Sequence, residues 1–190
     1  MAGKFAGRRA AQFAVLATLT LGAGAACDKP TAESNNTTSP HLQHDMTTLS
    51  PADVQVLRHA TNRFHTLDKA LNEGYAIFGG CFADSTLGGM GQHYANDKVI
   101  GDSAISLNRP ELLLYETDRA GQPQLVAVEY IVFVDEWLAK GHTSPPRLFN
   151  TDFHINSTLL PKPFYLLHAW VWKENPSGLL SDWNPRVSCN

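Results

Sequence analysis

The stretch that most constrains the fold is residues 125–134, Leu-Val-Ala-Val-Glu-Tyr-Ile-Val-Phe-Val, which is apolar on both of its alternating faces. Successive side chains of a strand point to opposite sides of a sheet, so this stretch predicts a strand that is covered on both sides. A second strand-like stretch, residues 111–117, precedes it. Residues 118–123 between them have turn-forming composition, and the sequence therefore predicts a hairpin.

An amphipathic helix is predicted before the hairpin. Ser50 has the character of an N-cap, Pro51 suits the first helical position, and Gly74 suits the position just after the helix. Apolar or small residues recur every three or four positions between these ends, at Val54, Leu57, Thr61, Phe64, Leu67 and Leu71. His59 and His65 lie off this stripe, which favours solvent-facing positions for both.

The remaining segments complete an α+β fold. Residues 75–109 are rich in glycine and predict loops with brief strands at 75–78 and 90–95, while residues 135–140 predict a short helix. A short extended piece is expected within 147–155, and residues 164–173 predict a strong strand. One helix followed by mainly antiparallel strands indicates an N-terminal helix packed on a curved sheet or half-barrel.

The first 26 residues are typical of a bacterial secretory signal peptide. Lys4, Arg8 and Arg9 form a basic start, and residues 13–23 form an apolar run too short to span a bilayer as a mature helix. The run ends in small residues before Cys27, which predicts lipidation of Cys27, the alternative being ordinary cleavage after Ala25.

This start divides the chain into three parts. Residues 1–26 are the signal peptide, residues 27–49 a polar, flexible tether, and residues 50–190 a single globular domain. The expected location is the periplasm or the cell surface, with the membrane as partner through the lipid anchor, or secretion if no lipid is attached. The net charge of −3 and the absence of a basic cluster after the signal peptide argue against nucleic acid as a partner.

The cysteine count predicts one disulfide. The chain has three cysteines, and lipidation of Cys27 leaves Cys81 and Cys189 as a pair. In an oxidising compartment such a pair favours a disulfide that ties the C-terminal tail to the start of the domain. The alternative role as a thiolate metal ligand is not supported by ligand spacing, because neither residue has another cysteine nearby.

Two strands contain a polar residue that their pattern does not predict. Glu129 shares a face of its strand with Leu125, Ala127, Ile131 and Phe133, and His168 shares one with Leu166 and Trp170. An ionised carboxylate among apolar side chains costs several kcal/mol unless a cation meets it. A buried histidine is easier to keep, because a neutral imidazole can bond a backbone carbonyl.

These two residues suggest a metal site. His93 follows Gly91, whose lack of a side chain permits close backbone approach, and His154 or Glu111 supplies a possible fourth ligand. Two histidines and a carboxylate are the donors of an open zinc site or of a facial triad for iron, and imidazole also suits copper. No compact ligand motif orders the set along the chain.

The most distinctive segments resemble an uncharacterised group of bacterial secreted proteins and lipoproteins. They comprise Gly-Met-Gly-Gln-His-Tyr at 89–94, the hairpin residues 111–116 and 128–130, and the segments 167–178 and 183–189 with their Leu-His-Ala-Trp-Val-Trp and Trp-Asn-Pro-Arg-Val-Ser-Cys motifs. The resemblance implies export and a shared fold, and it brings no activity.

Three functions remain open at this point. The first is a metal carrier or small metalloenzyme that uses His93, Glu129 and His168. The second is a non-catalytic pocket for a small ligand, lined by Tyr94, Tyr130, Trp170 and Trp172. The third is a structural or interaction lipoprotein in which Glu129 and His168 bond each other in the core. A serine hydrolase is disfavoured, because the chain has no Gly-x-Ser-x-Gly elbow.

Overall fold

The computed structural model describes residues 49–189 of the chain. The predicted signal peptide, Cys27 and all of the predicted tether except Leu49 lie outside these residues. Among the helices that are described, none combines the length and the apolar character needed to cross a membrane.

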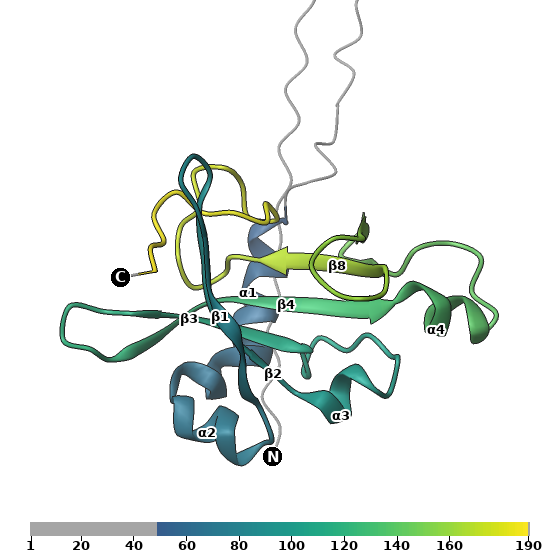
Figure 1. The fold of residues 1–190 in the computed structure, drawn as a ribbon, viewed down its shortest axis with the longest axis horizontal. Helices are drawn as coiled ribbons and strands as arrows, with labels where there is room; N and C mark the ends of the chain where they lie inside the picture. Colours follow the sequence, from purple (N-terminus) through teal and green to yellow (C-terminus); the bar gives the residue numbers. More distant parts are fainter. Residues whose placement is uncertain (1–48, 190) are drawn as a thin grey trace, which may run out of the picture. The chain divides into compact units, whose positions relative to one another are not determined.

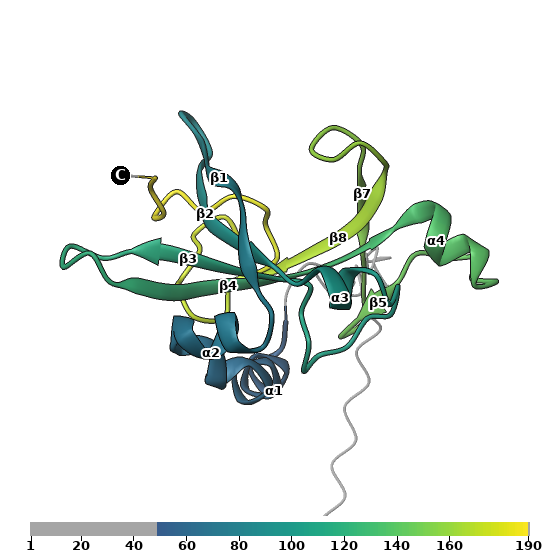
Figure 2. The same ribbon diagram turned by 60° about the horizontal axis from the view of Figure 1, so that its bottom comes forward.

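The domain is built on one six-stranded sheet in which every neighbouring pair of strands is antiparallel. In spatial order the strands are β1 Ala76–Asp84, β2 Gly88–Ala95, β3 Leu112–Thr117, β4 Pro123–Phe133, β8 Phe164–Ala169 and β7 His154–Asn156. The sheet curls into a half-barrel, with β1 and β2 rising on one side of β3 and β4 and β7 rising on the other (Figure 2). The predicted α+β class with a curved, mainly antiparallel sheet is confirmed.

Strand β4 is the buried centre of this sheet, as its apolar sequence predicts. It pairs with β3 on one side and β8 on the other, and its residues 125–132 are all buried. A bulge at Val126, between the pairs Leu114–Ala127 and Tyr115–Leu125, shifts the alternation of β4 by one residue. Leu125 therefore packs with Tyr115 and not, as the simple alternation suggests, on the side of Glu129.

The N-terminal helices cover the convex side of the sheet, which we call the helix face (Figures 1 and 2). The single predicted helix is divided into α1 Pro51–Thr61, a 3₁₀ turn Asn62–His65 and α2 Leu67–Asn72, with Thr66 in an extended conformation. Asn, Phe, His and Thr all have low helix propensity, which explains a break at this point. The predicted N-cap at Ser50 is present and forms a capping box with Asp53, and Gly74 has a positive φ. His59 and His65 are exposed, as predicted.

Three tyrosines of the helix face find hydrogen-bond partners inside the protein. The hydroxyl groups of Tyr75, Tyr115 and Tyr130 donate to the backbone carbonyls of Pro110, Phe64 and Leu107 at 2.6, 2.5 and 3.0 Å. The surrounding core is formed by residues of the helices and of alternate strand positions, among them Leu57, Phe64, Ala70, Leu113, Val128 and Leu167.

The opposite side of the sheet, which we call the concave face, has a second apolar core. Its buried residues include Met90, Leu112, Leu114, Ala127, Ile131, Leu166 and Trp170. The C-terminal tail packs here through Val187, and Gly89 exchanges two backbone hydrogen bonds of 3.0 Å with Asn184. The predicted disulfide between Cys81 and Cys189 is present and fastens the tail to β1.

The connecting segments differ from the sequence expectation mainly in length. The glycine-rich region forms a complete β1–β2 hairpin with two register shifts, where only brief strands are predicted. Strand β8 ends at Ala169, because the chain bends there and the N–H of Trp170 turns to the carbonyl of Leu179. The other elements are α3 Asp97–Ile100, α4 Val134–Ala139, and a small sheet of β5 Arg147–Leu148 and β6 Thr151–Asp152.

Candidate metal centre

Three of the predicted ligands meet on the concave face. Glu129 on β4 and His168 on β8 are direct cross-strand partners, and Glu129 also pairs with Leu112 of β3. His93 lies on β2, the next strand beyond β3. All three side chains are buried, with 4%, 6% and 1% of the residue exposed for His93, Glu129 and His168.

Their metal-binding atoms converge without bonding each other. The Nε2 atoms of His93 and His168 lie 3.5 and 3.7 Å from Oε2 of Glu129. One potential ligand atom from each residue lies within 4.8 Å of the others. Ordinary N–H···O hydrogen bonds measure about 2.7–3.2 Å, so these contacts are longer than good hydrogen bonds and act mainly through charge.

The orientation of His93 is set by its own strand. Nδ1 of His93 lies 3.2 Å from the carbonyl oxygen of Gly91, and because a carbonyl only accepts, Nδ1 carries the proton. Gly91 has φ +92°, and a Cβ atom there would lie 2.7 Å from the carbonyl oxygen of Tyr115. Only glycine therefore fits at this irregular point of β2. With the proton on Nδ1, the neutral ring of His93 keeps a lone pair on Nε2.

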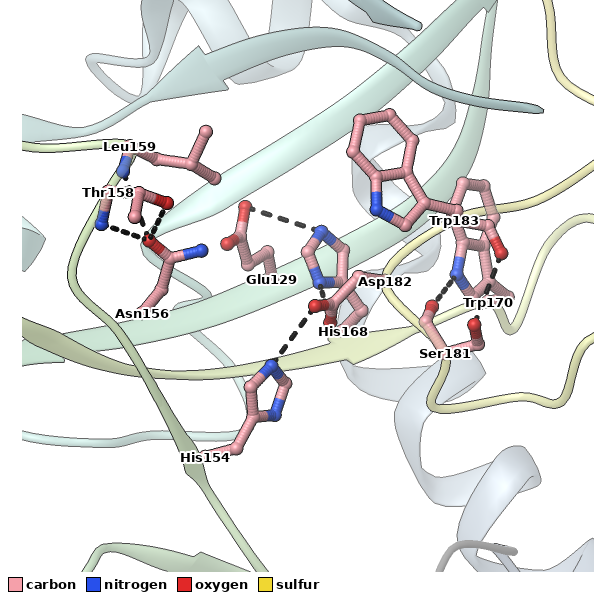
Figure 3. Close-up of polar contacts among 10 residues, drawn as sticks. All are labelled: Glu129, His154, Asn156, Thr158, Leu159, His168, Trp170, Ser181, Asp182 and Trp183. Atoms are coloured by element: carbon pink, nitrogen blue, oxygen red, sulfur yellow. Dashed lines mark hydrogen bonds and ion pairs between the residues drawn. The ribbon is translucent and has the colours of Figure 1, made fainter. Parts of the chain in front are cut away.

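His168 is oriented in the same way by Asp182. Nδ1 of His168 lies 3.2 Å from Oδ1 of Asp182, and Oδ2 of Asp182 lies 3.1 Å from Nε2 of His154 (Figure 3). Nε2 of His168 is buried and has no hydrogen-bond partner. A histidine whose far nitrogen is held by a carboxylate is the usual arrangement of a metal ligand, since the carboxylate fixes the ring and its tautomer.

Sequence reasoning missed Asp182. It lies in an irregular segment of the tail, where no periodic pattern marks a functional residue. The only sequence feature pointing to it is the predicted disulfide at Cys189, which returns the tail to the strand that pairs with His93.

The site brings two ionised carboxylates to its histidines. Burial alone would raise the pKa of Glu129, but His168 and His93 hold this pKa below its ordinary value, so the carboxylate is ionised. Burial likewise opposes charge on His168, and Glu129 and Asp182 together raise its pKa above the ordinary value. Burial of Asp182 works against ionisation, yet His154 and His168 hold its pKa well below the usual range.

A pocket of about 260 Å³ opens beside the centre. His93 and Glu129 contribute to its wall, whereas His168 lies behind them, toward Asp182. The rest of the lining is apolar apart from Asp97: Phe78, Phe82, Met90, Ile100, Leu112, Ile131, Phe133, Leu159, Leu160 and Phe164. A metal held by the three ligands would therefore have one side turned to a space of ligand size.

The four aromatic residues expected to form a cleft do not line this pocket. Tyr94 and Tyr130 directly follow His93 and Glu129 in their strands, so their side chains point to the opposite face and pack in the helix-face core. Trp170 stacks beside His168 with a ring separation of 6.4 Å. Trp172 lies beyond the end of β8 and donates to the hydroxyl of Thr61 on the helix side.

The two possible fourth ligands also lie outside the cluster. His154 contacts Asp182 and not the centre itself. Glu111 is fully buried and accepts a hydrogen bond from the N–H of Ile131. Burial raises the pKa of Glu111 to about 9, which makes it a neutral acid at neutral pH and a poor ligand.

Comparisons with known proteins found no relative of this chain. No family model, no curated protein and no solved structure matches the chain. The site itself combines two imidazole nitrogens and one carboxylate, and it could hold a metal ion.

Proposed function

We propose that the protein binds a divalent transition metal through Nε2 of His93, Nε2 of His168 and the carboxylate of Glu129. One observation carries the proposal: three potential ligand atoms converge in a buried site, and Nε2 of His168 has no hydrogen-bond partner there. Each histidine uses its Nδ1 on a carbonyl or carboxylate acceptor, which leaves its Nε2 for an ion. Even a protonated Nε2 of His168 would lie 3.7 Å from Glu129, too far for a good hydrogen bond.

The donor set suits zinc, copper or iron(II), which bind imidazole and carboxylate with further positions left open. Burial of the ligands and the adjoining pocket favour an ion that stays in place and meets a small molecule. A small metalloenzyme fits these features better than a carrier that must release its ion, and better than a core Glu–His pair, because the pair is not hydrogen-bonded.

We further propose that the domain works outside the cytoplasm, anchored by lipid on Cys27. The basic and apolar segments before Cys27 support this proposal. The disulfide between Cys81 and Cys189 adds independent support, because such bonds persist in oxidising compartments.

The test is the metal content of the full-length protein purified from the cell envelope without chelators, together with its intact mass. We expect one equivalent of zinc, copper or iron, and a mature protein that begins at Cys27 and carries lipid. His93→Ala should lose the metal and keep the fold, whereas His59→Ala, at an exposed position on α1, should keep both.

Chelation gives the second measurement. Removal of the metal should lower the melting temperature of the wild type and of His59→Ala, but not of His93→Ala, since only a competent site gains stability from its ligand. A wild-type protein that takes up none of the three ions at micromolar concentration, and melts identically with and without chelator, refutes the metal site. A mature N-terminus at Met1 refutes export separately.

A further inference from the structure

The pocket beside the candidate metal centre differs sharply in polarity from the centre itself. Phenylalanine and aliphatic side chains from β1, β2, β4 and the β7–β8 loop form its wall, and His93 and Glu129 provide polar groups beside the proposed ion. Its volume of about 260 Å³ is near the lower end of the roughly 300–1,000 Å³ typical of small-molecule sites. The shape fits a small molecule with an apolar body and one polar end.

The proposed ligands define the charge of that end. His93 and His168 bind as neutral groups, so a divalent ion with Glu129 alone leaves one positive charge in its immediate shell. In an apolar, poorly hydrated site this charge favours a single negative charge on the incoming ligand. Asp97 is exposed and contributes to the pocket from the start of α3, and its carboxylate disfavours an anion held anywhere but at the metal.

The outer part of the pocket is also apolar. Phe78 and Leu159 line it and remain 37% and 49% exposed. Leu159 is held in a turn by Asn156, whose side-chain oxygen accepts from the N–H groups of Thr158 and Leu159 at 2.9 and 3.0 Å (Figure 3). The turn thus presents an apolar side chain to the pocket, where it can cover the body of a bound molecule.

We propose that this pocket binds a small apolar monocarboxylate, with its carboxylate on the metal and its hydrocarbon body among the phenylalanine and aliphatic side chains. This inference rests on the proposed metal site and adds the chemical class of the ligand. The positive charge at the proposed metal favours a carboxylate at one end of the ligand, and the apolar lining favours a hydrocarbon body.

Octanoate is a suitable probe, and 1-octanol is its neutral counterpart of the same chain length. Calorimetric titration of the full chain should show octanoate binding at least about tenfold more tightly to zinc-loaded than to zinc-free protein, equivalent to about 1.4 kcal/mol. Octanol should bind both forms alike. Cobalt(II) in place of zinc provides a spectroscopic readout, because a carboxylate that joins the metal changes the visible absorption.

Two leucine-to-aspartate variants, one inside the pocket lining and one outside it, test where the ligand binds. Leu159→Asp places a carboxylate in the lining and should weaken octanoate binding about tenfold or more, while zinc affinity stays as in the wild type. Leu138→Asp is the control, because Leu138 is similarly exposed, at 47%, but lies on α4 outside the pocket lining. It should bind octanoate as the wild type does.

The outcomes separate this inference from the metal proposal. Failure to bind zinc or cobalt refutes the metal site itself. Normal zinc binding without octanoate binding refutes the ligand class alone. Equal octanoate affinity with and without zinc, or an unchanged cobalt spectrum, refutes coordination of the carboxylate. Equal loss of binding in Leu159→Asp and Leu138→Asp refutes the location.

Discussion

Each face of the sheet buries one glutamate, and the pKa values of the two glutamates shift in opposite directions. Glu111 lies beside the tyrosines of the helix face, and burial raises its pKa to about 9, so a proton neutralises it. Glu129 lies on the concave face between two histidines, its pKa is lowered, and it stays ionised. A proton therefore neutralises the glutamate of the helix face, whereas the concave face keeps a buried carboxylate ionised between two histidines and could hold a metal ion. This difference distinguishes a scaffold from a site.

The largest expected effect is on the pH dependence of stability, which shows whether Glu111 is neutral in the folded protein. A carboxyl whose folded pKa is about 9, against an ordinary 4.5, binds its proton more tightly in the folded state than in the unfolded state. Its contribution to stability is complete below pH 4.5 and is lost as the pH rises toward 9. The contribution of Glu111 to the free energy of unfolding should fall by about 1.4 kcal/mol per pH unit in this window.

Glu111→Gln has no such proton to lose, so its stability should change much less over the same range. Urea unfolding of both proteins at several pH values measures the difference. Parallel pH profiles for the wild type and the variant would show that Glu111 is ionised, and that the two faces do not differ as described.

The disulfide gives the next largest effect, because it holds the tail that covers the concave face. Cys189→Ser should lower the free energy of unfolding by about 4 kcal/mol through the long loop that the bond closes. Cys81→Ser should cost the same, and the double variant little more, since all three remove one bond. Cys27→Ser is the matched control and should leave the free energy of unfolding unchanged, because Cys27 has no part in this bond.

Glu129 and Tyr130 compare the two faces at adjacent positions of one strand. Glu129→Gln should weaken zinc binding about 100-fold, or about 2.7 kcal/mol, because it replaces a carboxylate ligand with a neutral amide. Tyr130→Phe should leave zinc binding intact and cost about 1 kcal/mol of stability through the lost hydrogen bond to Leu107.

Zinc titration and urea unfolding of the two variants decide this comparison. If Glu129→Gln leaves zinc binding unchanged and only destabilises the protein, by about 1–3 kcal/mol as for a broken buried polar pair, then Glu129 and the histidines form a structural pair and the concave face is a scaffold too.

The smallest of these effects concerns Asp182. Asp182→Asn should weaken zinc binding about 10–100-fold by loosening the orientation of His168, with the fold retained. His154→Gln is the control: His154 contacts the other oxygen of Asp182 from an exposed position, and its loss should change zinc affinity little. If Asp182→Asn and the wild type bind zinc equally well, then the contact of Asp182 with His168 has no role in metal binding.

Local pattern predicted the parts of the site that lie on regular strands. The apolar run around Glu129 and the strand around His168 each make one polar residue conspicuous, and both residues lie on the concave face. The same alternation argues against Tyr94 and Tyr130 as pocket residues, because each directly follows a proposed ligand. Applied strictly, it would have removed them from the expected cleft.

The rest of the site depends on contacts between distant segments. Asp182 reaches His168 only because the tail folds back over the sheet, and Leu159 reaches the pocket through a turn of irregular structure. The predicted helix breaks at Thr66 because several residues before it are weak helix formers. The spacing of apolar residues alone gives no sign of this break. Such features lack a local pattern by which a sequence could reveal them.

Nitrogen NMR of the histidine side chains, before and after addition of zinc, tests the central claim most directly. We predict that zinc shifts the Nε2 resonances of His93 and His168 and that their Nδ1 atoms stay protonated. His59 and His142, which are both exposed and lie outside the site, should not respond. Unchanged Nε2 resonances of His93 and His168 in the presence of zinc would contradict this prediction.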